Sequence, residues 1–367
     1  MLERVRALVE VESPSDDRAA VNRCVEAAAE MAASVGGWVR RHRRRTFGDV
    51  LEVRFSPTKR GAAKLPPVML LGHLDTVWPL GTLAGMPFRV EDGRLWGPGT
   101  LDMKAGVAMG LTAVEALRAA DALERPVVFL LNSDEEVGSA ASRPITEKLA
   151  RQAAAVFVLE PAQGLGGAYK TARKGVGDYR LRVSGVAAHA GVDFERGHSA
   201  IHELAYQLEK VRGFTDLDRG LTVNAGVLRG GTRTNVVAAD AAAEIDVRIA
   251  RTKDAARIEK KFRSLRVRDR GCVLRIEGGM NRPPMERTRA TAALFRRAAT
   301  LAKELGFSLA EAATGGGSDG NFTSALNVPT LDGMGAVGEG AHASHESVLL
   351  QDLVPRTALL AEMIRTT

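Results

Sequence analysis

Apolar runs of four or five residues recur in both end regions of the chain and predict the buried strands of a sheet. They cover residues 68–71, 127–131, 156–159 and 328–331. Each is followed by a loop or by a segment with helical periodicity, which is typical of an α/β sheet. In residues 103–120 the apolar side chains recur at the spacing of one helix face, and a last helix is expected near 356–365.

The middle of the chain has a different pattern, which predicts a second, smaller domain. We expect strands at 178–183, 222–228, 241–249 and 272–276, and helices at 200–212 and 253–265. The resulting order, βαββαβ, is that of a ferredoxin-like open sandwich. We therefore predict an α/β domain with a mixed sheet flanked by helices from residues 1–174 and 285–367, with a domain of residues 175–284 inserted into it.

Length and composition indicate an ordinary globular protein of two domains. The chain has 367 residues, of which 45% are hydrophobic and 26% charged. No apolar run approaches the roughly 18 residues of a membrane span, and the N-terminus lacks an apolar signal core. Cys24 and Cys272 form no closely spaced pair, which is typical of a reducing compartment. We expect a cytoplasmic protein, although the abrupt helix start at Met1 leaves the true start of the chain open.

The basic charge of the chain raises the question of a nucleic-acid partner. The net charge is +7, and much of it lies in residues 39–45 and 257–270. The second stretch repeats Ile258, Phe262 and Leu265 at helical spacing, so it reads as one amphipathic helix with a solvated basic face. Because no zinc-finger or RRM signature accompanies these stretches, we expect neither a nucleic-acid partner nor a membrane.

Side chains that are suited to binding metal follow the predicted strands of the larger domain. Ligands collect at the carboxyl ends of strands in open α/β sheets, so these side chains should converge on one edge. The candidate ligands are His73, Asp102, Glu136, Glu160 and His342. Imidazole with carboxylate suits zinc, or else cobalt or manganese. Two metal ions bridged by one carboxylate need about this many ligands.

Each of these features also has an ordinary structural explanation. A lone histidine after a strand is more often structural than a ligand, and the acidic run 134–136 has the composition of a solvated loop. Their shared position at strand ends favours the metal site. Asp75 adds a reason, because its carboxylate can accept a hydrogen bond from the second ring nitrogen of His73 and fix the tautomer.

A series of motifs along the chain resembles the M20 metallopeptidase family, most closely its glutamate carboxypeptidase (carboxypeptidase G2-like) branch. The motifs run in family order from residue 70 to residue 346. They are LLGHLDTV, LWGPGTLDMKAG, LLNSDEEVGS, VLEPA, AAHAG, GTRTNVV, DVR, TGGGSD and GEGAHASHE. The resemblance implies two divalent metal ions per chain, with zinc as the first expectation.

The resemblance also implies roles for the candidate ligands. It makes His73 and Glu160 ligands of one ion, Glu136 a ligand of the other, and Asp102 the bridge, followed by a cis peptide bond to Met103. The last ligand is either His342 or His345. The family pattern GxGxHxxxE matches His342, which we therefore expect to be the ligand.

The resemblance further implies catalytic and substrate-binding residues. Glu135 takes the role of general base, with Asp75 orienting His73. In the inserted domain, His189, Asn235 and Arg248 are implied to contact the substrate. From spacing alone, Arg248 would instead pair with Asp246 or face water. The inserted domain would act as a lid and join two copies into a homodimer.

Together these observations predict a metal-dependent hydrolase that cleaves an amide bond beside a free carboxylate. A carboxypeptidase that releases a C-terminal glutamate or a similar amino acid is the first interpretation. A small peptide or an N-acyl amino acid would be the substrate. An N-acyl-amino-acid deacylase or a dipeptidase is the alternative within the family. A non-catalytic metal-binding protein and a basic nucleic-acid binder are more remote alternatives.

Overall fold

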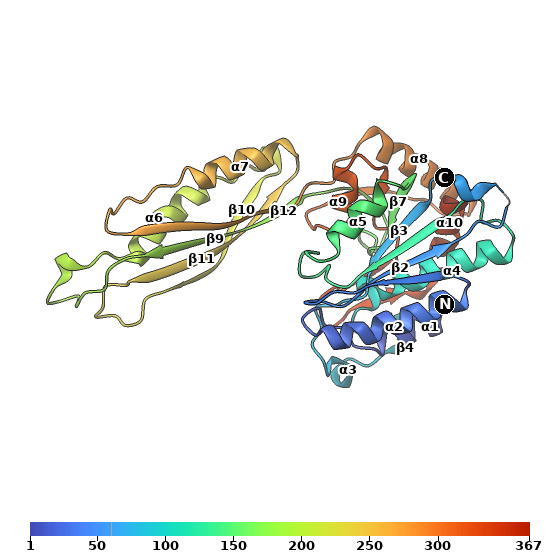
Figure 1. The fold of residues 1–367 in the computed structure, drawn as a ribbon, viewed down its shortest axis with the longest axis horizontal. Helices are drawn as coiled ribbons and strands as arrows, with labels where there is room; N and C mark the ends of the chain where they lie inside the picture. Colours follow the sequence, from blue (N-terminus) through green and yellow to red (C-terminus); the bar gives the residue numbers. More distant parts are fainter. Residues whose placement is uncertain (60) are drawn as a thin grey trace. The chain divides into compact units, whose positions relative to one another are not determined.

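The computed structural model describes residues 1–59 and 61–367, which divide into two compact units. The first unit comprises Met1–Ala172, Arg287–Thr314 and Ser318–Thr367 (Figure 1). The second comprises Arg173–Glu286 and Gly315–Gly317. Each unit has its own sheet and its own apolar core, so the two are described separately.

A six-stranded mixed sheet forms the centre of the first unit, in the order β1-β2-β6-β3-β7-β14. The strands are β1 (Trp38–His42), β2 (Val50–Phe55), β3 (Val68–His73), β6 (Val127–Asn132), β7 (Ala155–Val158) and β14 (Thr330–Leu331). Strands β3, β6, β7 and β14 are parallel to one another. Strand β2 runs antiparallel to β6 beside them, and β1 pairs antiparallel with β2 at the edge of the sheet. Strands β3 and β6 are buried along their whole length, which explains their continuous apolar sequence.

Helices cover both faces of this sheet (Figure 1). The helices of the first unit are α1 (Leu2–Val9), α2 (Arg18–Ser34), α3 (Thr82–Gly85), α4 (Ala105–Ala119), α5 (Arg143–Ala150), α8 (Arg289–Glu304), α9 (Gly320–Ala325) and α10 (Leu350–Thr366). Alternate strand residues form one core with α2, α4, α8 and α10 and a second core with α5. The predicted mixed sheet with flanking helices is therefore confirmed.

Two predicted helix boundaries differ from the structure. The helix expected from residue 103 begins at Ala105, because the preceding residues form an irregular turn, Thr100–Lys104, called here the Asp102 turn. The last helix begins at Leu350 rather than near residue 356 and contains Pro355. A proline usually marks the beginning or end of a helix, which explains the later predicted start.

Two small sheets complete the first unit. One has the order β15-β16-β5-β4, and the other pairs β13 with β8. Their strands are β4 (Arg89–Glu91), β5 (Arg94–Trp96), β8 (Tyr169–Arg173), β13 (Glu311–Thr314), β15 (Gly338–Glu339) and β16 (Ser347–Leu349). The first of these sheets holds the loop with both C-terminal histidines, because that loop connects β15 to β16.

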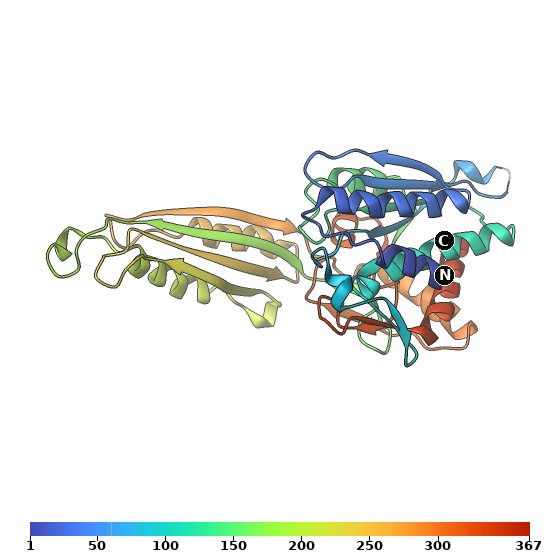
Figure 2. The same cartoon turned by 90° about the horizontal axis from the view of Figure 1, so that it is seen from below.

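The second unit contains a four-stranded antiparallel sheet in the order β10-β11-β9-β12. In chain order its elements are β9 (Gly175–Ser184), α6 (Ala200–Arg212), β10 (Thr222–Gly230), β11 (Asp240–Ile249), α7 (Lys253–Arg263) and β12 (Val273–Arg282). This is the predicted βαββαβ order. Figure 2 views the sheet with α6 and α7 behind it. The core lies between them and includes Tyr179 stacked on Phe262 at 3.9 Å between ring centroids.

The amphipathic character predicted for the basic stretch 257–270 is confirmed only for its first half, because α7 ends at Arg263 and residues 264–270 lie outside the helix. Ile258 and Phe262 are fully buried, while the basic residues of this helix lie on its outer side. Across the described part of the chain, no helix combines the length and the apolar character that crossing a membrane requires.

Candidate metal centre

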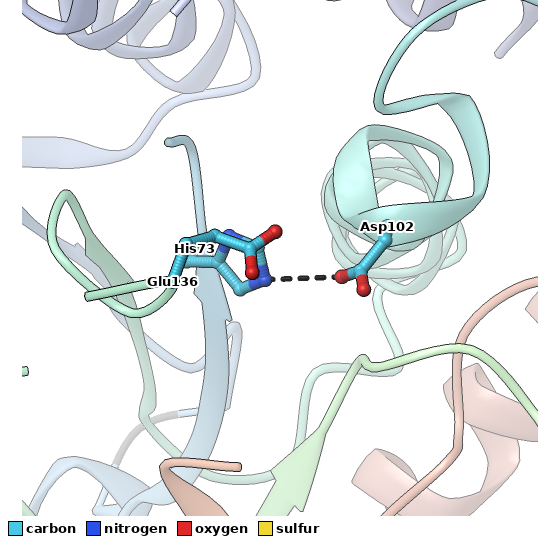
Figure 3. A group of neighbouring side chains, drawn as sticks. All are labelled: His73, Asp102 and Glu136. Carbon is cyan, nitrogen blue, oxygen red and sulfur yellow. Dashed lines mark hydrogen bonds and ion pairs between the residues drawn. The ribbon is translucent and has the colours of Figure 1, made fainter. Parts of the chain in front are cut away.

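Five side chains gather near the carboxyl ends of the central parallel strands. His73 is the last residue of β3, and Glu136 and Glu160 lie in the loops after β6 and β7. Asp102 projects from the Asp102 turn at the beginning of α4, and His342 comes from the loop between β15 and β16. Figure 3 shows His73 and Asp102 facing each other across the site. The parallel strands thus deliver side chains from distant parts of the chain to one edge.

The carboxylate of Asp102 lies between two imidazoles. Its Oδ1 is 3.1 Å from Nε2 of His73, and its Oδ2 is 3.4 Å from Nε2 of His342. Each imidazole also faces a second carboxylate. Oε1 of Glu160 is 3.7 Å from Nε2 of His73, and Oε1 of Glu136 is 3.2 Å from Nε2 of His342. The result is two groups of one histidine and one glutamate that share a single aspartate.

The donor atoms of this cluster are close enough for shared coordination. One atom from each of His73, Asp102 and Glu136 lies within 4.8 Å of the others, and the same holds for His73, Glu135 and Glu160. All these donors are imidazole nitrogens or carboxylate oxygens, the ligand types that zinc, cobalt and manganese accept. The residues therefore fit one or two divalent ions in chemistry and in spacing.

The carboxylates of the cluster stabilise positive charge on the two histidines. Burial opposes protonation of His73, but hydrogen bonds to Asp102 and Asp75 outweigh it and raise its pKa well above the usual value. Hydrogen bonds to Asp102 and Glu136 raise the pKa of His342 to about 10. Burial would raise the pKa of Asp102, yet its bonds to both histidines hold that pKa far below the ordinary range. A bound divalent ion would supply this positive charge in place of the protons on the two histidines.

Asp75 holds both the acidic loop of residues 134–136 and the ring of His73 in place. Its fully buried carboxylate accepts hydrogen bonds from the Ser15 hydroxyl at 2.7 Å and from the backbone N–H groups of Glu135 and Glu136 at 3.2 Å. Nδ1 of His73 donates to the backbone carbonyl of Asp75 at 2.9 Å, while the nearer carboxylate oxygen is 3.5 Å away. The tautomer is thus set largely by that carbonyl, and Nε2 is directed at the cluster.

Of the two candidate C-terminal histidines, His342 is the one placed against the cluster. Its backbone has φ of 62°, in the left-handed region that few residues other than glycine adopt. Its side chain is about half exposed, with 49% of its surface accessible. Within the described residues, His345 makes no hydrogen bond or ion pair with a carboxylate of the site. The motif match to His342 and the geometry therefore agree.

Glu346 has a part in the site that sequence reasoning did not assign. Its fully buried carboxylate accepts hydrogen bonds from the backbone N–H groups of Gly99 at 2.9 Å, Leu101 at 2.8 Å and Asp102 at 3.0 Å. A fourth comes from Nε1 of Trp78 at 2.8 Å. Glu346 thereby fixes the Asp102 turn to the loop that carries His342. Its place in the GxGxHxxxE pattern was the available signal.

The three predicted substrate-binding residues lie in the second unit. His189 and Asn235 are exposed and adjacent, because the backbone N–H of Ala190 donates to the carbonyl of Asn235 at 3.0 Å. On β11, Arg248 is paired with Asp246, which accepts from its Nε at 2.9 Å and its Nη2 at 2.7 Å. The ion pair expected from spacing alone is therefore present. The remaining nitrogen, Nη1, is 3.5 Å from the carbonyl of Gly315.

A mixed histidine and carboxylate cluster at the carboxyl edge of an α/β sheet is the kind of site that metal-dependent hydrolases use. The chain belongs to peptidase family M20/M25/M40, whose model matches residues 69–366. Members of this family generally bind two divalent metal ions. The Asp102–Met103 peptide bond is cis, so that prediction from the resemblance is confirmed.

Comparisons with individual proteins agree on the family but differ in activity. The chain is 28% identical to carboxypeptidase G2 of Pseudomonas sp. (strain RS-16) over 300 residues, which cover 80% of this chain and 72% of that protein. It is 29% identical to succinyl-diaminopimelate desuccinylase of Dechloromonas aromatica over 326 residues, covering 83% and 84%. The glutamate carboxypeptidase branch is therefore one of several that the chain resembles.

Solved structures reproduce the fold over the whole chain. Aminopeptidase PepT of Bacillus cereus superposes with a TM-score of 0.80 at 23% identity, covering 99% of this chain and 97% of that one. An M20 family metallo-carboxypeptidase of Sulfolobus solfataricus gives 0.79 at 16% identity, covering 99% and 98%. At these identities the likeness establishes the fold alone.

The contacts of Glu346 generate a prediction about stability. In Glu346→Gln, an amide NH₂ would replace one carboxylate oxygen and face buried N–H donors, which would lose their acceptor. Because each unsatisfied buried donor costs about 1–3 kcal/mol, we expect the free energy of unfolding to fall by about 2–4 kcal/mol in urea titrations. The matched control is Glu339→Gln, whose half-exposed ion pair with Arg94 should be worth less than about 1 kcal/mol. Equal losses in both variants would contradict the role of Glu346.

Proposed function

We propose that the protein is a dinuclear metallopeptidase that hydrolyses an amide bond beside a free carboxylate. A carboxypeptidase that releases glutamate or a similar C-terminal amino acid is our first assignment. The observation that supports it most is the placement of Asp102 between His73 and His342, each of which also faces its own glutamate. An N-acyl-amino-acid deacylase or a dipeptidase with the same site is the alternative, favoured by the similarity to a desuccinylase.

The side chains of the cluster divide into two ligand sets in this proposal. His73, Glu160 and Asp102 would hold one ion, and Asp102, Glu136 and His342 the other, with zinc as the first choice. When bound, such ions supply Lewis acidity toward water and toward the scissile carbonyl. Asp75 keeps His73 and the acidic loop in position, as its hydrogen bonds to both indicate.

Glu135 would act as the general base. It lies beside His73 and Glu160, whereas the neighbouring Glu136 faces His342. Its carboxylate would accept a proton from the attacking water and return it to the leaving amine, so the proton ends on the released amino group. The backbone N–H bond of Glu135 to Asp75 keeps this carboxylate at the site.

The two adjacent glutamates allow the assignment to be tested. We expect the purified protein to hold two divalent ions per chain by metal analysis and to hydrolyse members of a panel of N-acyl and peptidyl amino acids. Glu135→Gln should keep both ions and lose about 10²–10⁴ in kcat, because its amide cannot accept a proton. Glu136→Gln should instead lose metal, and exposed Glu91→Gln should change neither property.

Several outcomes would overturn the assignment. Similar behaviour of the two glutamate variants would show that their roles are not divided in this way. Two bound ions without hydrolysis of any amide would favour a metal-binding protein that is not an enzyme. Protein without metal that is retained on DNA in a salt-dependent manner would favour the basic nucleic-acid binder.

Arg248 is our candidate for recognition of the substrate carboxylate, together with Asn235 and His189. Asp246 fixes the guanidinium through Nε and Nη2, while Nη1 donates to the carbonyl of Gly315 at 3.5 Å. A guanidinium that is held in this way is already ordered, so less freedom is lost when an anion binds. The ordinary alternative is that the ion pair with Asp246 only stabilises β11. Substitution of Arg248 distinguishes this structural role from recognition of the substrate.

Substitution of Arg248 should affect substrates with a free carboxylate selectively. For Arg248→Lys we expect a loss of about 1.5–3 kcal/mol in kcat/KM on an acyl-glutamate, the contribution of a charge-assisted hydrogen bond. The same variant should lose little on a substrate whose carboxylate is amidated, and exposed Arg251→Lys should lose little on either. Equal losses on both substrates would assign Arg248 to structure, and Arg173 would be the next candidate.

We also propose that the second unit joins two copies of the chain. Strand β10 is an outer strand of its sheet, and an apolar hollow of about 290 Å³ lies beside it, lined by Ile201, Leu204, Leu208 and Leu228 among others. Leu228 is 64% exposed. An unpaired edge strand flanked by exposed apolar side chains is suited to pairing with another chain.

The dimer can be tested by sedimentation at micromolar concentration. We expect a dimer for the unmodified chain and a monomer for Leu228→Asp, because a carboxylate would be buried in the interface. Leu217→Asp is the matched control, since Leu217 is 73% exposed and does not line this hollow. A monomeric unmodified chain would contradict the proposal.

A further inference from the structure

The face of the second unit's sheet opposite α6 and α7 carries a row of arginines. On β9, Tyr179, Leu181 and Val183 are buried in the core, so Arg180 and Arg182 point to the open face. Arg182 pairs with Ala242 on one side and with Arg275 on the other, and Ala242 pairs with Arg229. One cross-strand row therefore reads Arg229, Ala242, Arg182 and Arg275, with Arg180 one row away.

This row lies along a hollow of about 490 Å³. Arg180, Arg182, Arg229 and Arg275 all line it, and alanine and glycine residues make up much of the remaining surface. Neighbouring strands are about 4.8 Å apart, so Arg229 and Arg182 stand roughly 10 Å apart across the small side chain of Ala242. The small side chain of Ala242 leaves room for a ligand, and the surrounding guanidinium groups offer N–H donors to it.

The positive charge of the hollow is only partly compensated. Nη2 of Arg180 lies 3.6 Å from Oε1 of Glu244, and Nε of Arg182 lies 3.3 Å from Oε2 of Glu277. Within the described part of the chain, Arg229 and Arg275 have no carboxylate partner. Of the described residues that line the hollow, Asp240 is the only acid. Like charges directly opposite each other in a sheet, such as Arg182 and Arg275, are destabilising. A bound anion would relieve that repulsion.

The charge distribution along the chain supports the same conclusion. Residues 173–286 contain 22 Lys and Arg against 15 Asp and Glu, a difference of +7 that equals the net charge of the whole chain. The rest of the chain is balanced. The second unit thus carries the entire excess of positive charge, which attracts anions to this part of the molecule.

We propose that this hollow binds a small polyanion with at least two oxyanion groups. Guanidinium groups recognise phosphate and carboxylate through paired N–H donors. Positions about 5–10 Å apart suit a chain of phosphates or a polycarboxylate better than a single phosphate. Of the proposed substrate contacts, Arg248 is distant from the hollow, because it lies six residues from Ala242 on β11, roughly 20 Å along the strand. His189 and Asn235 lie next to Val236, which lines the hollow, so the anion site borders these two residues. The proposal does not depend on the assigned enzymatic activity.

Titration calorimetry of the full chain at low salt tests the site. The probes are pyrophosphate, citrate and orthophosphate, with the metal content measured before and after each titration because the first two chelate. We expect one saturable site per chain, with pyrophosphate or citrate binding at least tenfold more tightly than orthophosphate. Tighter pyrophosphate would identify a phosphate chain, and tighter citrate a polycarboxylate.

Three variants assign the binding to the hollow. The double substitution Arg229→Gln and Arg275→Gln should weaken binding at least tenfold, and Ala242→Leu should weaken it similarly by filling the space without changing charge. The control, Arg257→Gln with Arg270→Gln, removes the same charge from exposed positions elsewhere in the unit and should change affinity less than twofold. Unchanged circular dichroism would show that the variants are folded.

Other results would overturn the proposal. Absence of saturable binding would do so, as would a control variant that weakens binding as much as the substitutions in the hollow. Orthophosphate that binds as tightly as the larger anions would also contradict it. So would a titration heat that follows the loss of metal and is the same in every variant. Binding of DNA without binding of any small anion would also overturn it. That result would make the face a nucleic-acid surface.

Discussion

The position of the Asp102 carboxylate between two imidazoles is the constraint on which the candidate centre depends. A carboxylate in this surrounding must be compensated by charge, and both histidines face it through Nε2. The rest of the site serves to hold these three groups. A backbone carbonyl sets the ring of His73, Asp75 fixes the acidic loop, and Glu346 fixes the turn that carries Asp102.

The parallel part of the sheet explains why groups so distant in sequence can meet. Its strands are buried on both faces, so polar side chains are excluded along their length and appear where the strands end. At that edge, hydrogen bonds to His342 and His73 lower the pKa of Asp102 and keep its carboxylate ionised. A bound cation would supply the same positive charge as these two histidines.

Much of the architecture could be predicted because it follows from local patterns. The apolar runs of β3 and β6 and the amphipathic spacing of α7 each reflect burial that a single segment records. The ligand candidates followed from their position after strands. The hydrogen bonds of Glu346 could not be predicted, because they join residues that neither periodicity nor spacing relates. The carbonyl of Asp75 was missed because sequence patterns carry no information on backbone acceptors.

The second unit shows the same limit in another form. Its element order was readable from periodicity, and the Asp246 and Arg248 pair followed from their alternation on one strand. The arginine row was not anticipated, because it depends on the register of four strands whose order in the sheet, β10-β11-β9-β12, differs from their order in the sequence. One residue of slip between β9 and β12 would place Arg275 on the other face.

The contact between Glu346 and the Asp102 turn has a consequence for the order of folding. The carboxylate and the amides that it accepts from are separated by 244 to 247 residues. Contacts of such sequence separation form only after a long loop has closed, which makes them slow and dependent on earlier structure. On a ribosome, the strands and α4 emerge well before residue 346. The turn that presents Asp102 is therefore completed only after residue 346 has been made, so the centre matures after the strands and α4 that surround it.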